Sequence, residues 1–571
     1  MTYDLIVRGG TIVDGSGLPG FRGDVGVSGD RIAAIGDLKG QAAGKIIDAE
    51  GMTVSPGFVD GHTHMDAQVF WDPLGTCSSW HGVTSVVMGN CGFSLAPCAE
   101  KDKHLVVHNL ERAEDIPAAA MEAGIPWSWE TFPEYLDAVD KLPKGINYAG
   151  YVGHSALRTY AMGRRAFDRA ADADDLASMT RELESSLRAG AIGMSTSRSG
   201  SHRTPEGRPV ASRLADWSEI EALVGLMGRL KAGIFEISRE STDYDSDKRR
   251  DEQQRLKKLA LDTGVPITFG SSWSKRDARD NWRSHFAMVD ETIAAGGKMM
   301  VQGTATWQCS LRSFETLLPF DKMAVWSDFR KLPLAEQEAG LRDPGMRKTL
   351  VDAVHNHKHA PNPAFPNAFQ RAIDWNWIVP LDRTLPPFRS IAEIAKATGK
   401  DPVDIVIDMA LEKHLKMFFI APSNNEDQDY VLANIRHPKS VVTFSDAGAH
   451  VATTLNPIHT YLLGHWVRQA RAVTLEAAIR KITFDIAAFW GLKGRGLLRQ
   501  GNYADIVVFD PETVAPAMPS MVRDLPSGAK RLLQKAIGIQ ATVVNGQTLL
   551  ENGEHTGALP GRLMRGPLAR N

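Results

Sequence analysis

Two histidines separated by a single residue stand in the run PGFVDGHTH, residues 56–64. Side chains two residues apart along a β-strand point to the same side. We therefore expect His62 and His64 to project together, an arrangement that lets two imidazoles bind one cation. The competing interpretation is a chance pair of histidines on a surface strand.

An aspartate ends a second apolar run, VVTFSDAGAH, at residues 441–450. A carboxylate at the end of a strand can bind a metal ion and accept a proton from water. Alternatively, Asp446 caps a helix that follows the strand. Together with the histidine pair, Asp446 favours a metal-dependent hydrolytic site.

The elements that must position these residues follow from the pattern between them. Eight short apolar runs recur between residues 53 and 446, and helical segments separate several of them. Alternating strands and helices predict an α/β fold with a parallel sheet. Eight repeats predict a closed (β/α)8 barrel of the TIM type, whose active site lies at the carboxyl ends of the strands.

Both ends of the chain show a different sequence pattern, in which short predicted strands alternate with Gly-rich turns. We predict that residues 1–55 and 490–571 pair in one small β-sandwich domain and that residues 56–489 form the barrel. Two segments, near residues 99–140 and 309–438, do not fit the strand–helix repeat. Long ordered insertions at a catalytic face often form lids or substrate walls.

Composition narrows the class of protein and its partners. The 571 residues carry a net charge of −3, and the 43% hydrophobic and 23% charged residues are typical of a soluble globular protein. We therefore expect a small-molecule substrate and neither a nucleic-acid nor a membrane partner. The start lacks the pattern of a signal peptide, and four cysteines give no disulfide framework, so we expect a cytoplasmic protein. The oligomeric state stays open.

Five motifs in order along the chain resemble the D-aminoacylase branch of the amidohydrolase superfamily, the N-acyl-D-amino-acid deacylases. The motifs are PGFVDGHTHMD, GNCGFSLAP, GHSALR, GAIGMSTS and SDAGAH, and the resemblance covers nearly the whole chain. It implies that His62, His64, Cys91 and Asp446 are metal ligands and that Asp446 is also the general base. GNCGFSLAP is the more branch-specific motif, although a free cysteine is often only a small buried apolar residue.

The sequence departs from this family at two places. D-aminoacylases carry histidines after the fifth and sixth strands, in motifs like THxR and SHxK. Here Ile237 and the run Gly270-Ser271-Ser272 stand in those positions. We therefore expect one metal ion rather than two, and zinc suits the mixed N, O and S ligands, although other first-row metals remain open. His202, a histidine of the insertion (His355, His357 or His359) or Lys275 could still supply a lost ligand.

Residues after the third and fourth strands are candidates for substrate binding. His154 and Arg158 follow the third strand, and a purely structural role for His154 is an equal alternative. Arg198 is the first choice for gripping a substrate carboxylate, since a guanidinium binds one through two hydrogen bonds. His202 is a candidate donor to the scissile carbonyl, and Trp307 would line an apolar pocket.

The function expected from these residues is metal-dependent amide hydrolysis. The resemblance points to N-acyl amino acids, D-configured ones included, with Asp446 moving the proton. One alternative is a hydrolase of the same fold that acts on a cyclic amide, an aryl amide or a urea, because fold does not determine substrate. Another is a non-catalytic scaffold that has lost its metal.

Overall fold

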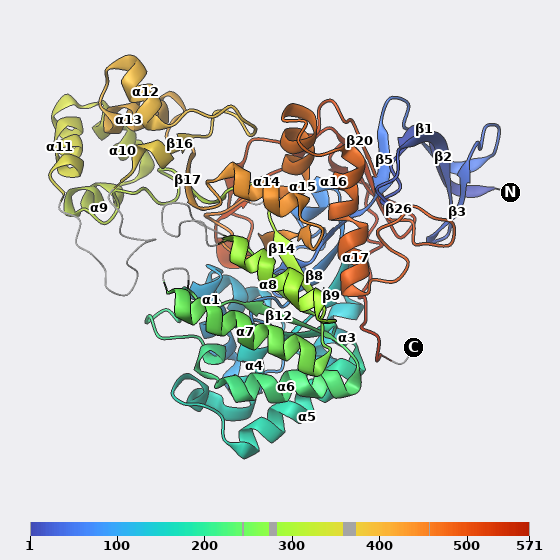
Figure 1. The fold of residues 1–571 in the computed structure, drawn as a ribbon. Coiled ribbons are helices and arrows are strands. Elements are labelled where there is room, and N and C mark those ends of the chain that lie inside the picture. The colour runs from blue at the N-terminus through green and yellow to red at the C-terminus, as the bar shows by residue number, and fades with distance from the viewer. Residues whose placement is uncertain (1, 243–244, 273–281, 358–372, 456, 570–571) are drawn as a thin grey trace.

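The computed structural model describes residues 2–242, 245–272, 282–357, 373–455 and 457–569 (Figure 1). It shows a mixed α/β fold, and each of the eight apolar runs contains a strand. These strands are β6 (Phe58–Asp60) with β7 (His62–Thr63), β8 (Val83–Met88), β9 (Asn147–Gly150) with β10 (Val152–Gly153), β11 (Gly193–Ser197), β12 (Ile234–Ser238), β13 (Ile267–Gly270), β14 (Met299–Gly303), and β18 (Ser440–Val442) with β19 (Phe444–Ala447).

Parallel pairing connects these strands in a continuous order. β6 pairs with β8 and β8 with β9. The order continues from β10 through β11, β12, β13 and β14 to β18. β19 then pairs with β7, so the last strand lies beside the first. Since one residue separates β6 from β7, β9 from β10 and β18 from β19, the pairing returns to its starting strand.

Helices follow most of these strands. They include α4 (His154–Met162), α5 (Ala173–Ala189), α6 (Trp217–Leu230), α7 (Ser246–Thr263), α8 (Trp282–Ala294), α14 (Gln428–Arg436), α15 (Ile458–Tyr461), α16 (Leu475–Ile482) and α17 (Phe484–Trp490). The start of α5 shows why a helix forms there: the Asp172 and Asp175 side chains make a reciprocal capping box. The helix ends at Gly190, which has a left-handed conformation.

One nine-stranded sheet joins the two ends of the chain. It contains β1 (Tyr3–Ile12), β2 (Phe21–Ser28), β3 (Arg31–Gly36), β4 (Ala43–Asp48), β5 (Thr53–Pro56), β20 (Ile506–Phe509), β25 (Ile539–Val544), β26 (Gln547–Glu551) and β27 (Glu554–His555). The first apolar run is therefore divided, because β5 pairs with β20 in this sheet while β6 and β7 enter the parallel set. Gly57 lies at the division, where a Cβ atom would collide with Thr84.

The two long insertions are largely helical. The first contains α1 (Lys103–Ala113), α2 (Ala118–Gly124) and α3 (Phe132–Lys141). The second contains β15 (Gln308–Arg312), α9 (Ala324–Arg330), α10 (Leu334–Arg342), α11 (Pro344–His355), β16 (Val379–Pro380), α12 (Ile391–Thr398), α13 (Pro402–Glu412) and β17 (Phe419–Asn424). Helices α9–α13 share a separate core around Phe320 and Trp326 and project as a lobe, drawn at the upper left of Figure 1.

Short elements near the C-terminus complete the description. They are a π-helical segment (Leu462–Gln469) and the strands β21 (Ala515–Pro516), β22 (Ser520–Val522), β23 (Arg531–Leu533) and β24 (Ala536–Ile537). Within the described ranges, no helix combines the length and the apolar character needed to span a bilayer.

A buried polar network connects the end sheet to the parallel strands. Arg495 and Asp505 form an ion pair in which both side chains are about 95% buried. Arg495 also donates to the Asn545 side chain at 2.9 Å, and Asn545 donates to the Asn147 side chain at 2.7 Å. Because Asn147 begins β9, this network holds the two sheets together.

We expect Asp505→Ala to destabilise the protein by about 3–5 kcal/mol, because it leaves the Arg495 guanidinium buried without its counter-charge. The apparent Tm measured by calorimetry should fall by several degrees. Glu50→Ala is the matched control, since it breaks an exposed pair with Arg22, and water screens such a pair so well that the Tm should hardly change. Equal effects of the two substitutions would contradict a structural role for the network.

Candidate metal centre

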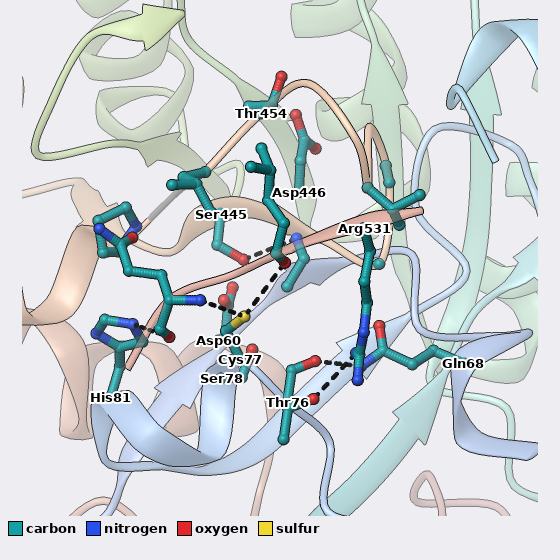
Figure 2. A pocket seen from close by; sticks show the side chains of 18 of the residues that line it. Asp60, Gln68, Thr76, Cys77, Ser78, His81, Ser445, Asp446, Thr454 and Arg531 are labelled. Atoms are coloured by element: carbon teal, nitrogen blue, oxygen red, sulfur yellow. Dashed lines mark hydrogen bonds between the residues drawn. The ribbon is translucent and has the colours of Figure 1, made fainter. Parts of the chain in front are cut away.

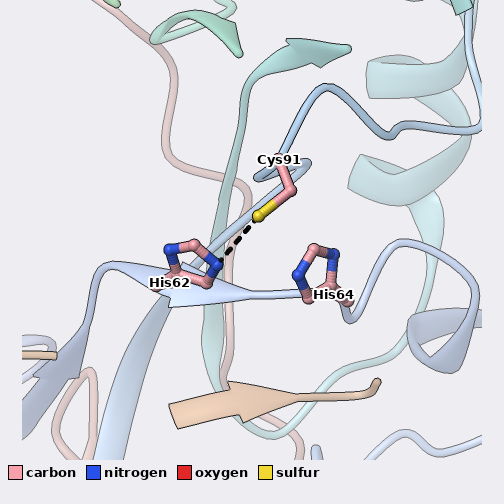
Figure 3. A group of neighbouring side chains, drawn as sticks. All are labelled: His62, His64 and Cys91. Atoms are coloured by element: carbon pink, nitrogen blue, oxygen red, sulfur yellow. Dashed lines mark hydrogen bonds between the residues drawn. The ribbon is translucent and has the colours of Figure 1, made fainter. Parts of the chain in front are cut away.

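His62 and His64 lie at the carboxyl end of β6–β7 and are almost completely buried. Figure 3 shows their rings beside the Cys91 thiol, and the potential ligand atoms of all three lie within 4.8 Å of one another. His62 Nδ1 is hydrogen-bonded to Gln302 Oε1. That bond leaves Nε2 to face Cys91 Sγ at 3.4 Å. A ring nitrogen oriented by a hydrogen bond at the other nitrogen is the usual arrangement of a metal-binding histidine.

Asp446 reaches the same point from β19. Its Oδ1 lies 3.2 Å from His62 Nε2 and 3.6 Å from His64 Nε2. Burial alone would raise the pKa of Asp446, but the hydrogen bonds and charges of the two histidines hold it well below its usual range. Asp446 is therefore a carboxylate at neutral pH, as a ligand or a proton acceptor must be.

The same interaction acts on His62. Burial alone would lower the pKa of His62, but the hydrogen bond and charge of Asp446 outweigh burial and raise it to about 9. By contrast, burial lowers the pKa of His64 to about 4. A cation that binds both rings must therefore displace a proton from His62, which makes its affinity increase with pH.

Cys91 follows β8 in a tightly held turn. The Asn90 side chain donates to the carbonyls of Thr63 and Val87, which anchors the turn against β7. Cys91 itself has a φ of 57° and donates its backbone N–H to Glu236 Oε2 at 2.7 Å. Burial and the surrounding carboxylates raise the pKa of the thiol well above its usual value. A bound cation reverses this balance, because a coordinated thiol is deprotonated.

The donor set fits a divalent cation. Both ring nitrogens of His64 are buried: Nδ1 has no hydrogen-bond partner among the described residues, and Nε2 faces only the carboxylates of Glu114 and Asp446, at 3.4 and 3.6 Å. Buried polar atoms are almost always paired, so such atoms point to a missing ligand. Two imidazoles, a thiol and a carboxylate around one point match the N, S and O ligands of zinc.

Sequence reasoning missed two carboxylates in this centre. Glu114, just after α1, places Oε2 3.4 Å from His64 Nε2, and Glu236 lies on β12. Burial raises the pKa of Glu114 well above its usual value and that of Glu236 to about 7. A lone carboxylate in the apolar strand IFEIS was an available signal for Glu236, whereas ERAED resembles an ordinary helix end and gives none for Glu114.

Two of the candidate substrate-binding residues are buried around one glutamate, and a third is only partly buried. His154 and Arg158 are fully buried and both bind Glu219, His154 Nε2 at 2.7 Å and Arg158 Nη1 at 2.5 Å. This geometry favours the structural alternative for His154. Arg198 donates to the Ala215 carbonyl at 2.6 Å and to Glu240 at 3.3 Å.

The remaining candidates have separate local surroundings. His202 is hydrogen-bonded through Nδ1 to Ser197 Oγ at 2.7 Å and lies beside Cys91 and Glu114. Trp307 packs on Phe388 with ring centroids 5.1 Å apart. His355 is half exposed and pairs with Asp401. His359 and Lys275 lie outside the described residues.

A small cavity of about 80 Å³ is lined in part by Asp446 (Figure 2). Asp60, His81 and Ser445 line it, and Arg531 reaches Thr76 at its edge with a 3.0 Å hydrogen bond. Pockets for small-molecule ligands usually enclose about 300–1,000 Å³. This cavity therefore suits a few water molecules beside the carboxylate rather than a substrate.

Comparison with known proteins gives consistent results. The sequence pattern of the family described as "Amidohydrolase family" matches residues 45–550. D-aminoacylase of Alcaligenes xylosoxydans xylosoxydans is 28% identical over 98% of this chain and 97% of its own, and N-acyl-D-glutamate deacylase of that organism is 29% identical over 98% and 96%. The solved N-acyl-D-glutamate deacylase of Bordetella bronchiseptica, in complex with zinc and a phosphonate inhibitor, aligns with a TM-score of 0.66 at 25% identity, covering 99% of this chain and 100% of that one.

We expect His62→Ala and His64→Ala each to remove the tightly bound metal while leaving the fold intact, because each deletes a ligand from the four-atom set. Metal content of the purified variants, measured by atomic emission alongside circular dichroism, checks this. His355→Ala replaces an imidazole outside the centre and should keep the metal content of the unmodified protein. Retention of that content by either variant of the pair would show that the ligands are wrongly assigned.

Proposed function

Because the chain belongs to the amidohydrolase family, we propose that it is a metal-dependent amide hydrolase that deacylates N-acyl amino acids. The observation that carries this proposal is the convergence of His62, His64, Cys91 and Asp446 on one point. The similarity to a D-aminoacylase and to an N-acyl-D-glutamate deacylase supports the choice of substrate class, including its D configuration.

The proposal assigns one tightly bound divalent ion, zinc, to His62, His64, Cys91 and Asp446. A cation held there would polarise the substrate carbonyl and lower the pKa of water toward neutrality. Gln302 orients His62 for this task through the hydrogen bond to Nδ1.

Asp446 moves the proton in the proposed reaction. Asp446 is a carboxylate in this setting, and we assign to it the proton of the water that attacks the carbonyl carbon. The carboxylic acid formed then donates that proton to the leaving nitrogen as the C–N bond breaks. The small cavity beside Asp446 supports this role, because it has room for water next to the carboxyl group.

Substrate contacts are assigned to the rim of the centre. We assign the substrate carboxylate to Arg198, the scissile carbonyl to a hydrogen bond from His202, and the acyl or side-chain group to an apolar wall that includes Trp307. His154 and Arg158 both bind the buried Glu219, and His154 is also hydrogen-bonded to Thr196, so we assign them to positioning β11 and the Arg198 that follows it.

We also propose a domain architecture and a cellular location for the protein. The ring of parallel pairing supports a (β/α)8 barrel over residues 56–489, with the insertions forming its walls. The mixed end sheet supports a small β-sandwich domain from residues 1–55 and 490–571. We further propose that the protein is cytoplasmic and acts on a small-molecule substrate.

A panel of N-acyl-D- and N-acyl-L-amino acids, assayed beside cyclic amides, aryl amides and ureas, tests the proposal. Turnover confined to N-acyl amino acids is the expected result. Hydrolysis of the cyclic amides alone would show that the protein acts on that substrate class instead. A protein that neither binds metal nor hydrolyses any compound of the panel would be a non-catalytic scaffold.

We expect Asp446→Asn to lower kcat at least about 10²-fold, the lower range for general acid–base catalysis. An amide keeps the shape of the side chain but cannot accept and return a proton. Rates at saturating substrate and metal check this. If the variant retains a tenth of the original turnover, Asp446 does not transfer the proton.

We expect Arg198→Ala to raise KM far more for N-acyl amino acids than for the matching neutral amides. A hydrogen bond to a charged group contributes about 1.5–3 kcal/mol, and only the acids offer one. Arg208→Ala, which breaks an exposed pair with Asp168, is the control and should change neither KM. If acids and amides are affected equally, Arg198 acts only through its contacts with Ala215 and Glu240.

A further inference from the structure

A partly buried arginine, Arg213, lies at the rim of the metal centre. It belongs to the short turn Ala211–Leu214, and its Nη1 donates to the His202 carbonyl at 3.1 Å. The His202 ring lies beside Cys91 and Glu114. Burial and nearby charges, that of Arg213 among them, lower the pKa of this ring to about 3. The guanidinium is therefore close enough to the centre to meet a bound substrate.

The positive charge of Arg213 has no carboxylate partner within the described part of the chain. Burial lowers the pKa of its guanidinium, and the charges of Arg203 and Arg198 lower it further. The Glu240 carboxylate that pairs with Arg198 at 3.3 Å is shared with Arg255 at 3.2 Å. A cation that is partly withdrawn from water without a counter-charge is costly, and an anionic ligand would remove that cost.

We propose that Arg213 binds a second carboxylate of the substrate, beside the one assigned to Arg198, so that the protein prefers N-acyl amino acids with an acidic side chain. The inference rests on the proposed function and narrows its substrate class. A guanidinium presents a fork of N–H donors that matches the two oxygens of a carboxylate. The bond to His202 uses Nη1 of Arg213 and leaves Nε and Nη2 for such a ligand.

The position of the two arginines indicates which half of the substrate carries the second charge. Arg198 donates to the carbonyl of Ala215, two residues from Arg213, and the charges of the two guanidiniums act on each other. In an N-acyl amino acid, the α-carboxylate and the side chain lie on the same side of the scissile C–N bond, and the acyl group lies on the other. Two neighbouring guanidiniums therefore fit an aspartate- or glutamate-like half rather than an acidic acyl group.

The turn that carries this arginine is held from several sides. The Ala211 N–H donates to the Asn109 side chain of α1 at 3.0 Å, and the Ser212 N–H donates to Ser155 Oγ of α4 at 3.2 Å. Ser212 Oγ donates to the Ser197 carbonyl at 3.3 Å, which ties the turn to the end of β11. A fixed backbone limits the positions that the guanidinium can take, and such preorganisation favours discrimination between substrates.

Kinetics of the zinc-loaded, full-length protein test the inference. N-acetyl-aspartate and N-acetyl-glutamate are compared with N-acetyl-asparagine and N-acetyl-glutamine, each in D and L forms, because the amides match the acids in shape and differ in charge. We expect kcat/KM to be at least about tenfold higher for the acids, since hydrogen bonds to charged groups are the stronger ones. N-succinyl-alanine, which carries its second carboxylate on the acyl side, should be no better a substrate than N-acetyl-alanine.

Variants assign the preference to this side chain. Arg213→Gln should lower kcat/KM for the two acids by at least about tenfold and change it far less for the amides. If Arg213 only supported His202 through its carbonyl, acids and amides would suffer alike. Arg213→Lys keeps the charge and should keep part of the preference. Arg208→Ala is the matched control on the same loop, since it breaks an exposed pair with Asp168, and it should keep the full preference.

The outcomes separate this inference from the proposed function. Equal rates for acids and amides in the unmodified protein would overturn the inference and leave the proposed function intact. An acid preference that persists undiminished in Arg213→Gln would do the same, and so would faster turnover of N-succinyl-alanine than of N-acetyl-alanine. Absence of turnover with every N-acyl amino acid would overturn the proposed function and this inference with it.

Discussion

The parallel pairing of β19 with β7 is the contact on which the centre depends. It brings Asp446 to His62 across more than 380 residues of chain, with Phe444 opposite His62 and Ala447 opposite Thr63. The Thr443 hydroxyl accepts a hydrogen bond from the Gly61 N–H, and the Ala447 carbonyl accepts one from the His64 N–H at 2.7 Å. Gly448 is required at this junction, because its φ is +96° and a Cβ atom would collide with the His64 carbonyl. The ligand geometry therefore follows from backbone pairing rather than from side-chain flexibility.

Burial then decides the chemistry of the groups that this pairing assembles. It lowers the pKa of His64 and His202 to about 4 and 3, which keeps their nitrogens available as ligands. It raises the pKa of Glu114 and Glu236, because a carboxylate loses its hydration when it leaves water. A cation resolves both effects at once, since it accepts the imidazole lone pairs and compensates the carboxylate charge.

Much of this arrangement could be predicted from the sequence, since the signals are local. The alternation of apolar runs and helices indicates the parallel strands, and the two-residue spacing of His62 and His64 indicates their shared side. The division of the first run between two sheets could not be predicted, because it depends on the partner strand β20, far away in the sequence. The place of Glu114 in the centre could not be predicted for the same reason. Contacts of the first insertion with His64 and His450 set its position, and no local sequence pattern encodes them.

The two absent histidines illustrate the difference between a missing motif and a missing property. Ile237 and Ser271 offer no imidazole, and Ser271 Oγ is instead hydrogen-bonded to Tyr430 at 2.6 Å. The adjacent position on β12, however, carries Glu236, and Glu114 and His202 enter from the segments that follow β8 and β11. What a cation requires is lone pairs and negative charge at the right distance, and these can come from any element that reaches the carboxyl ends of the strands. A strand without its histidine therefore removes the capacity to bind a cation only where no neighbouring segment supplies another lone pair or negative charge.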